Sequence, residues 1–463
     1  MQHEQPISTN THSRRDFLRR FGYGVGASAF AYLDNQDQAF ANQIIGPHIP
    51  PRAKSVIFLF MCGGVSHIDT FDPKGNRWAG KMMDITGSDN GQSQKRPVIY
   101  CPRTFTRYGE SGTPVCEWFP HIGGVIDDIA VVRSMVTHEI GHFPAAIQMS
   151  TGHRRRTFDN PSLGAWLSYS LGSANDNLPT FVNMGRPLSP LQITGGYFGA
   201  GEAATPFQAT GAPLRHLSTP ESIATDQRRR QMELLSRMNG DFHNQYAHDG
   251  NIAARVRSYE LAARLQVSAP EAVDFRDEPA HITNLYGIDN KESEPFGRQA
   301  LLARRLVERG VRFVQICHGG INNGDWDSHD SVEDHAPLCR QTDKPIAGLI
   351  ADLKQRGLLD STLVVWASEF GRTPWSQNTI GRDHNPHGFS IWLAGGGVKG
   401  GMVLGATDDI GLNSVENRHY VGDLQATILQ QMGLDYHKLE VEVNGAPTKV
   451  IDDCEGPINE ILA

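Results

Sequence analysis

Four short apolar stretches constrain the fold of this chain more than any other feature. Each is rich in Val, Ile, Leu or Phe without strict polar alternation, which is typical of strands buried on both faces of a parallel sheet. Helical patterns precede the last two stretches, at residues 296–309 and 344–356. A helix between consecutive buried strands forms a βαβ unit, so the sequence predicts an α/β fold with a mostly parallel sheet. The four stretches are residues 55–61, 129–135, 311–317 and 362–367.

The rest of the chain is consistent with one large domain over residues 42–463. A region rich in Gly, Pro and Thr (185–215) reads as a surface loop, and a charged helical pattern follows it, so we expect a largely helical insertion at about 185–290. Further helices are predicted at residues 161–171 and 421–432, with Gly433 just past the end of the second. The net charge of −8 provides no basic excess for a nucleic-acid groove, so nucleic acid is excluded as a partner.

Residues 1–41 have the pattern of an export signal. Arg14 and Arg15 precede an apolar run at 21–33, and residues 39–41 (Ala-Phe-Ala) match the small-x-small cleavage pattern. The paired arginines predict a twin-arginine (Tat) signal, read by the Tat export machinery; the alternative is an ordinary amphipathic helix. The run is shorter than the ~20 residues of a membrane span. We therefore expect a mature protein in the periplasm or outside the cell, without a stable membrane span.

The six cysteines show neither CxxC pairs nor the spacing of a zinc ribbon. In an oxidising compartment, Cys101 and Cys116 can close a loop by forming a disulfide. The alternative for any of these cysteines is a buried thiol, as expected for Cys62 and Cys317, which end apolar stretches.

Polar residues follow each of the four predicted strands. In open α/β sheets the ligand binds outside the carboxyl ends of the strands, where these residues would meet. Carboxylates and imidazoles together are the ligands of a catalytic divalent cation, and buried carboxylates need a positive charge close by. The alternative is a polar rim of helix caps and hydrogen-bonded turns. The candidates include Asp69 after the first strand, His142 after the second, Asp327 and His329 after the third, and Glu369, His384 and His387 after the fourth.

Several of these segments resemble the alkaline phosphatase and sulfatase superfamily. The strand that ends in Ser368-Glu369-Phe370-Gly371 resembles the superfamily strand ending in Ser-Asp-His-Gly, and residues 422–427 (GDLQAT) resemble a late sulfatase helix. Residues 142–146 (HFPAA) match the spacing of the sulfatase nucleophile element. GGVSHIDTFDPK, WDSHD and SEFGRTP, with the Tat leader, are similar to the exported domain-of-unknown-function 1501 family. The resemblance implies an alkaline-phosphatase-like three-layer sandwich with a mostly parallel central sheet and a helical insertion.

The chain departs from the superfamily pattern at the nucleophile and at the metal ligands. His142 stands where sulfatases have the residue that becomes formylglycine, so formylglycine chemistry is not expected. Glu369-Phe370 replaces the metal-binding Asp-His pair. By analogy with alkaline phosphatases, Asp327, His329 and His387 would hold one zinc-type ion. Asp69 and Glu369, with His384, would hold a second.

The resemblance and the residues together predict a metal-dependent hydrolase of phosphate or sulfate esters, acting on a small molecule or a glycan. The cation would be Zn, with Mn and Ca as alternatives, and would activate water. Arg372 or Arg382 would bind the anionic group, and His142 would act as base, ligand or covalent acceptor, or only cap a helix. The competing hypothesis is a non-catalytic binding or assembly protein on an inherited hydrolase fold.

Overall fold

A computed structural model describes residues 45–85, 94–154, 160–209, 271–322, 325–376, 380–443 and 445–463, with a few separate residues between 226 and 265. The predicted leader and about half of the predicted insertion lie outside these residues. Among the described residues, no helix combines the length and the apolar character that crossing a membrane requires.

The centre of the fold is a nine-stranded mixed sheet in the order β14-β6-β13-β10-β1-β9-β7-β8, with β17 also paired to β6. All pairings are parallel except those of β13, which runs antiparallel to β10 and to β6. The predicted α/β fold with a mostly parallel sheet is therefore confirmed. The strands are β1 (Ser55–Cys62), β6 (Ile129–Val136), β7 (Phe181–Met184), β8 (Thr205–Phe207), β9 (Phe313–Gly319), β10 (Thr362–Ala367), β13 (Phe389–Ala394), β14 (Met402–Leu404) and β17 (His419–Tyr420).

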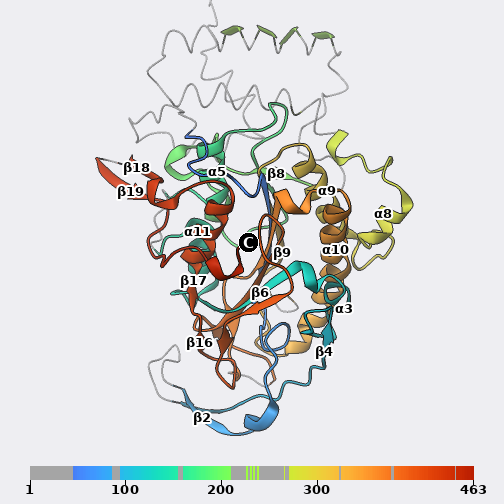
Figure 1. Cartoon of the computed structure of the whole chain (residues 1–463), viewed down its shortest axis with the longest axis vertical. Coiled ribbons are helices and arrows are strands. Elements are labelled where there is room, and N and C mark those ends of the chain that lie inside the picture. The colour runs from blue at the N-terminus through green and yellow to red at the C-terminus, as the bar shows by residue number, and fades with distance from the viewer. Residues whose placement is uncertain are drawn as a thin grey trace, which may run out of the picture.

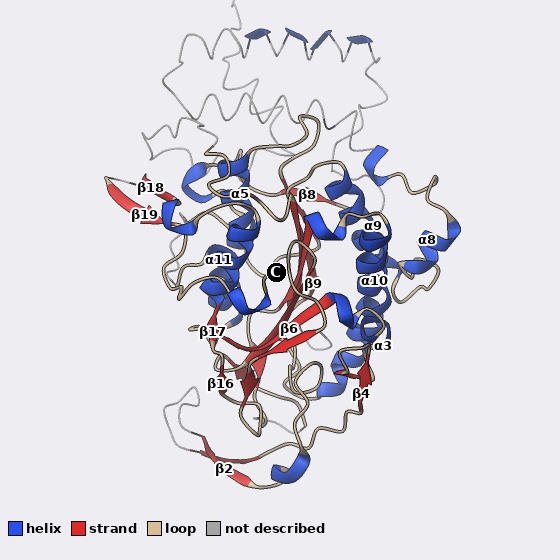
Figure 2. Ribbon diagram, in the orientation of Figure 1, coloured by secondary structure: helices blue, strands red, loops and turns tan. Residues whose placement is uncertain are grey.

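Helices cover both faces of this sheet and make three layers (Figures 1 and 2). Strand β1 is apolar on both faces and therefore needs a helical layer on each. Ile57, Leu59 and Met61 pack into the core under α9 and α10, and the residues between and before them pack into the core under α4, α5 and α11. One layer contains α3 (Pro120–Gly123), α8 (Ala280–Leu285), α9 (Glu294–Glu308) and α10 (His335–Gln355). The other contains α4 (His142–Thr151), α5 (Leu163–Leu171) and α11 (Val421–Gln431).

Most predicted elements are confirmed within a few residues, with two differences. Helix α10 begins at His335, well before residue 344, because buried Leu338 and Cys339 extend its apolar face. The predicted loop at 185–215 contains the edge strand β8, which pairs only with β7 and is too short to show a period. As predicted, Gly433 follows α11 with a positive φ of 87°.

Smaller elements complete the described chain. All six cysteines are unpaired, so of the two alternatives for Cys101 and Cys116 the structure has the buried thiols and not the disulfide. Two-stranded sheets join β2 (Met82–Ile85) to β3 (Gln94–Pro97), β4 (Phe105–Tyr108) to β5 (Thr113–Cys116), β11 (Gly371–Arg372) to β12 (His384–Asn385), β15 (Ala406–Thr407) to β16 (Ser414–Glu416), and β18 (Glu440–Val443) to β19 (Ala446–Lys449). Short 3₁₀ helices lie at Asn76–Trp78, Ile126–Asp128, Pro190–Ile193, Gly196–Phe198, Val332–Asp334, Leu359–Ser361, Tyr436–Lys438 and Asn459–Ile461.

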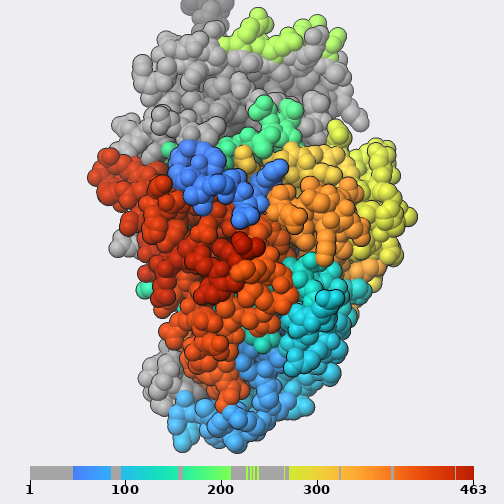
Figure 3. All heavy atoms as spheres, viewed as in Figure 1, coloured from blue at the N-terminus to red at the C-terminus, as the bar shows by residue number. Residues whose placement is uncertain are grey.

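The beginning of the described chain packs against its C-terminal part. In Figure 3 the first blue atoms lie on the red C-terminal segments, and the backbone N–H groups of His48 and Arg52 donate to the carbonyls of Gly433 and Gln431. These contacts tie the first described residues to the end of α11.

One edge of the sheet collects the loops that matter for function. Strands β1, β6, β9 and β10 point the same way, so their carboxyl ends share this edge, which we call the rim. Because β13 is antiparallel, it begins at the rim, where Phe389 lies opposite Met135 of β6. The segment 368–388 therefore leaves the rim at the end of β10 and returns to it at the start of β13.

Candidate metal centre

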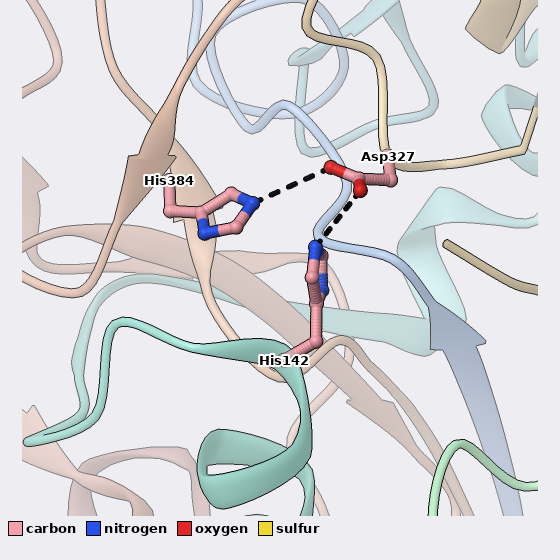
Figure 4. A group of neighbouring side chains, drawn as sticks. All are labelled: His142, Asp327 and His384. Carbon is pink, nitrogen blue, oxygen red and sulfur yellow. Dashed lines mark hydrogen bonds and ion pairs between the residues drawn. The ribbon is translucent and has the colours of Figure 1, made fainter. Parts of the chain in front are cut away.

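The carboxylate of Asp327 lies at the centre of the polar cluster on the rim. It follows β9, and three imidazoles approach it (Figure 4 shows two of them). Its Oδ2 lies 3.1 Å from Nε2 of His142. Its Oδ1 lies 3.0 Å from Nε2 of His329 and 3.4 Å from Nε2 of His384. His142 is the first residue of α4, and His384 begins β12. Of the predicted site residues, the structure thus brings together His142, Asp327, His329 and His384.

In each of the three imidazoles, Nδ1, the ring nitrogen that points away from Asp327, contacts its own oxygen acceptor. Nδ1 of His142 lies 2.7 Å from Oε1 of Glu369. Nδ1 of His384 lies 2.8 Å from the carbonyl of Ile140, and Nδ1 of His329 lies 3.3 Å from Oδ1 of Asp383. Carboxylate and carbonyl oxygens only accept hydrogen bonds, so each Nδ1 carries the proton. All three rings therefore present Nε2 to Asp327, and in the neutral form Nε2 carries a lone pair.

This arrangement requires positive charge between the rings and the carboxylate. Lone pairs on Nε2 and on the carboxylate repel one another unless the rings are protonated or a cation lies between them. Nε2 of His142 is buried and has no hydrogen-bond partner, although it lies close to Asp327. Ligand atoms of His142, Asp327 and His384 all lie within 4.8 Å of one another. Ligands of a tetrahedral zinc ion are about 3.3 Å apart, so these three residues fit a zinc-type cation.

The electrostatics of the cluster agree with that reading. Burial opposes the charge of Asp327, but the three imidazoles and Arg372 outweigh it and hold its pKa far below the usual range. Contacts with Asp327 and Asp383 raise the pKa of His329 to about 9. Burial lowers the pKa of His142, yet its contacts with Asp327 and Glu369 produce a net rise. Burial lowers the pKa of His384. Without a cation, protons on the imidazoles supply the charge that Asp327 needs.

Glu369 supports His142 instead of joining a second metal site. Its side chain is fully buried, and its carboxylate accepts hydrogen bonds from the backbone N–H of Gly63 (2.9 Å) and from His142. A carboxylate behind a ligating histidine fixes the ring and raises its basicity. Within the described ranges, His142, Asp327 and His384 form the only group of three potential ligands. The predicted second site of Asp69, Glu369 and His384 is therefore not formed.

Asp69 and His387 lie apart from the cluster. Asp69 is fully buried and accepts from Nε of Arg382 (2.6 Å), from the Ser66 hydroxyl and from the Cys101 thiol (3.2 Å). Burial opposes its charge, but Arg382 lowers its pKa overall. These contacts occupy both oxygens, so Asp69 has a structural role. His387 is exposed and lies outside the cluster, so the predicted set of Asp327, His329 and His387 is not formed. Asp327 instead groups with His142 and with His384 of strand β12, and His329 lies beside them.

Arg372 and Arg382 are not placed to bind a substrate anion. Arg372 is fully buried, and its donors reach the carbonyls of Gly63 and Gly64 and Oδ1 of Asp327 (2.6 Å). Arg382 is likewise buried against Asp69 and the carbonyl of Thr373. Both guanidinium groups donate their hydrogen bonds to groups inside the protein, so the predicted role of these arginines in binding a substrate anion is not supported. Their contacts instead join the rim loops.

Backbone geometry and a buried histidine join the loops after β1 and β9. Gly63 has a φ of 126°, and a Cβ atom there would lie 2.3 Å from the carbonyl oxygen of Gly320, so only glycine fits. Nε2 of His335 accepts from the N–H of Ser66 (3.1 Å), which leaves Nδ1–H to donate to the hydroxyl of Ser328 (3.0 Å). Burial lowers the pKa of His335 to about 3, so it stays neutral and fixes the loop that carries Asp327.

Sequence reasoning missed three of these supporting groups. Asp383 directly precedes the candidate ligand His384 in the sequence, and a carboxylate in that position is a usable signal. The carbonyl of Ile140 and the imidazole of His335 gave no signal, since their roles depend on backbone position. Of the carboxylates predicted as metal ligands, only Asp327 belongs to the candidate centre.

Comparisons with known proteins add the fold relationship and the family. No curated protein matches the chain. Among solved structures it is similar to the PsFucS1 sulfatase from Pseudoalteromonas sp. (12% identity, TM-score 0.35, covering 83% of this chain and 68% of that one). It is also similar to TAB5 alkaline phosphatase (13%, 0.33, 85% and 99%) and to the C-terminal periplasmic domain of EcEptC from Escherichia coli in complex with Zn (9%, 0.37, 91% and 99%). These low scores carry no argument about chemistry. Residues 53–462 match the family described as "Protein of unknown function (DUF1501)", and the chain belongs to that family.

Proposed function

We propose that this protein is an exported, metal-dependent hydrolase of phosphate or sulfate esters. One observation carries the proposal: three imidazoles, held by separate acceptors at Nδ1, turn Nε2 toward the carboxylate of Asp327, and ligand atoms of His142, Asp327 and His384 lie within 4.8 Å of one another. A cluster that serves only as a polar rim has no need for this arrangement, because hydrogen-bonded caps satisfy their own atoms.

In this proposal His142, Asp327 and His384 hold the ion, and Glu369 and the carbonyl of Ile140 keep the two imidazoles in place. A bound divalent cation polarises ester oxygens and lowers the pKa of water to near ~7. Three protein ligands are typical of catalytic zinc sites, which keep one position for water or substrate. Zn is the metal that fits best, and Mn and Ca are the alternatives.

His329 is the proton carrier in this scheme. Its side chain is 33% exposed, more than that of His142 or His384, and Asp383 holds its Nδ1. With Nδ1 held by Asp383 and Nε2 beside Asp327, this ring is placed to pass a proton to the leaving-group oxygen. No Ser, Thr or Cys belongs to the cluster as described, so water is the nucleophile.

The experiment measures metal content and turnover on the same preparation. Mature protein is purified without added metal, its Zn, Mn and Ca are counted by mass spectrometry, and hydrolysis of aryl phosphate and aryl sulfate is followed. We expect one ion per chain, and we expect chelation to remove hydrolysis and zinc to restore it. Metal-free protein without turnover after zinc is added contradicts the proposal. A stoichiometric ion without turnover on any ester overturns the hydrolase and favours the non-catalytic binding protein.

We propose further that residues 1–41 direct Tat export to the periplasm or beyond. Replacing Arg14 and Arg15 together by lysine should leave uncleaved precursor in the cytoplasm, because the Tat machinery reads the arginine pair. Fractionation with an antibody against the mature chain measures this, and a variant with only Arg19→Lys serves as the control. Normal export of the doubly substituted protein would refute the assignment.

A further inference from the structure

The side chain of Arg96 reaches the candidate centre from a distant part of the chain. It belongs to β3, which pairs with β2, the strand labelled at the lower end of the molecule in Figure 1. Its Nη1 donates to the backbone carbonyl of Ser376 (2.6 Å) and lies 3.9 Å from Oδ2 of Asp383. The side chain is 17% exposed, so the protein covers most of it. One guanidinium group thus contacts both Ser376 and Asp383.

Both contacts of Arg96 lead to His329. The hydroxyl of Ser376 donates to the backbone carbonyl of His329 (2.9 Å), and Oδ1 of Asp383 lies 3.3 Å from Nδ1 of the imidazole. The backbone at Gly381 packs so closely on the same carbonyl that a Cβ atom would not fit there. The backbone and the ring of His329 are therefore held by separate groups, and Arg96 contacts one group of each kind.

The two histidines among the candidate metal ligands have other supports. Glu369 holds Nδ1 of His142, and the carbonyl of Ile140 holds Nδ1 of His384. A change at Arg96 should therefore affect the third imidazole of the cluster and leave the two ligating rings in place.

We propose that Arg96 is a positioning residue, which holds His329 in place through Asp383 and Ser376. Its positive charge attracts the carboxylate of Asp383, and a restrained carboxylate behind an imidazole fixes the ring. Its hydrogen bond to the carbonyl of Ser376 steadies the hydroxyl that binds the backbone of His329. The catalytic consequence rests on the proposed function, in which His329 passes a proton to the leaving group.

The first test observes the imidazole directly and needs no substrate. Protein with isotope-labelled histidine is compared with its Arg96→Met variant by NMR, and the ring signals of His329 are identified by their loss in His329→Gln. In Arg96→Met we expect the Nδ1–H signal of His329 to shift or to exchange faster with water, and the signals of His142 and His384 to stay unchanged. Lys95→Met is the matched control, since Lys95 lies next to Arg96 on β3 with a side chain that is 69% exposed, and it should alter none of these signals.

The second test compares leaving groups. An acid that protonates the leaving oxygen contributes most when the leaving group is poor. Arg96→Met should therefore lower kcat by roughly tenfold for an alkyl ester and by less than about twofold for a nitrophenyl ester. KM and zinc content should stay unchanged. Arg96→Lys keeps the positive charge but not the planar fork, so it should restore part of the lost rate.

Unchanged His329 signals in Arg96→Met overturn the inference, whatever the activity. Loss of zinc from this variant, or an equal fall in kcat for both esters, also overturns it, since Arg96 would then support the centre as a whole. Altered His329 signals without hydrolysis of any ester support the placement of His329 by Arg96 and reject the hydrolase.

Discussion

Asp327→Asn should abolish metal binding and lower hydrolysis by more than 100-fold. Asp327 is the one carboxylate that all three imidazoles face, and the substitution removes its charge while keeping its size. A neutral amide is a poor ligand for zinc, and its N–H₂ group would oppose an imidazole nitrogen or Arg372. Metal content by mass spectrometry and kcat/KM on an aryl ester measure the two effects.

The matched control is His387→Gln, because His387 lies three residues from His384 but is exposed and outside the cluster. It should keep metal and rate. Asp327→Asn leaves the buried charge of Arg372 without its carboxylate, so circular dichroism must show that the variant folds. Should it fail to fold, His384→Gln provides the same test at a side chain that is 20% exposed. Full metal occupancy in folded Asp327→Asn or His384→Gln would disprove the site.

Glu369→Gln should weaken zinc binding by about 10- to 100-fold, although Glu369 touches no ion in our assignment. Loss of a partner behind a ligating histidine has effects of this size. Oε1 accepts from both Nδ1 of His142 and the N–H of Gly63, and Oε2 accepts from the Ser368 hydroxyl and, at 3.2 Å, from the same Gly63 N–H. Glutamine removes the negative charge behind His142 and replaces one of these acceptor oxygens by a donor. The buried N–H₂ group that replaces this oxygen also costs about 1–3 kcal/mol of stability if unpaired. Competition with a fluorescent chelator measures the zinc affinity.

A double-mutant cycle distinguishes this positioning role from direct ligation. If Glu369 acts through His142, then adding Glu369→Gln to His142→Gln should change zinc affinity less than twofold. If Glu369 binds the ion itself, the two losses should multiply, and our assignment is then wrong. Ser368→Ala, which removes a hydroxyl beside the same carboxylate, is the control for local disturbance and should change the affinity little.

The positions of the central strands could be predicted because a strand that is buried on both faces appears in the sequence as a short, uninterrupted apolar run. Residues 362–367 form β10 with the predicted bounds, since each of them is buried and no polar residue interrupts the run. Strand β8 was not predicted because it has three residues at the edge of the sheet, of which only one is buried, and so forms no apolar run. The start of α10 was predicted too late for the same reason: its first turns mix buried apolar residues with exposed polar ones, so they show no clear pattern in the sequence.

The sequence predicted four of the residues that meet in the candidate site, but not what each of them does there. The carboxyl ends of parallel strands share one edge, which was enough to bring His142, Asp327, His329 and His384 together from distant parts of the chain. Which acid faces an imidazole and which faces a guanidinium depends on loop geometry. Asp69 and Asp327 both lie in polar loops, yet Arg382 occupies one and three histidines approach the other.

Because β13 runs antiparallel to β10, the segment between Ala367 and Phe389 leaves the sheet and re-enters it at the same edge. Both of its ends are anchored on neighbouring strands at one margin of the sheet, so no crossover helix depends on its length or composition. It supplies Glu369, Asp383 and His384 to the candidate centre. Buried Arg372 and Arg382 belong to the same stretch and bond to the loops after β1 and β9. One continuous segment therefore both provides groups of the centre and holds the neighbouring loops together, so a change in its length would disturb both.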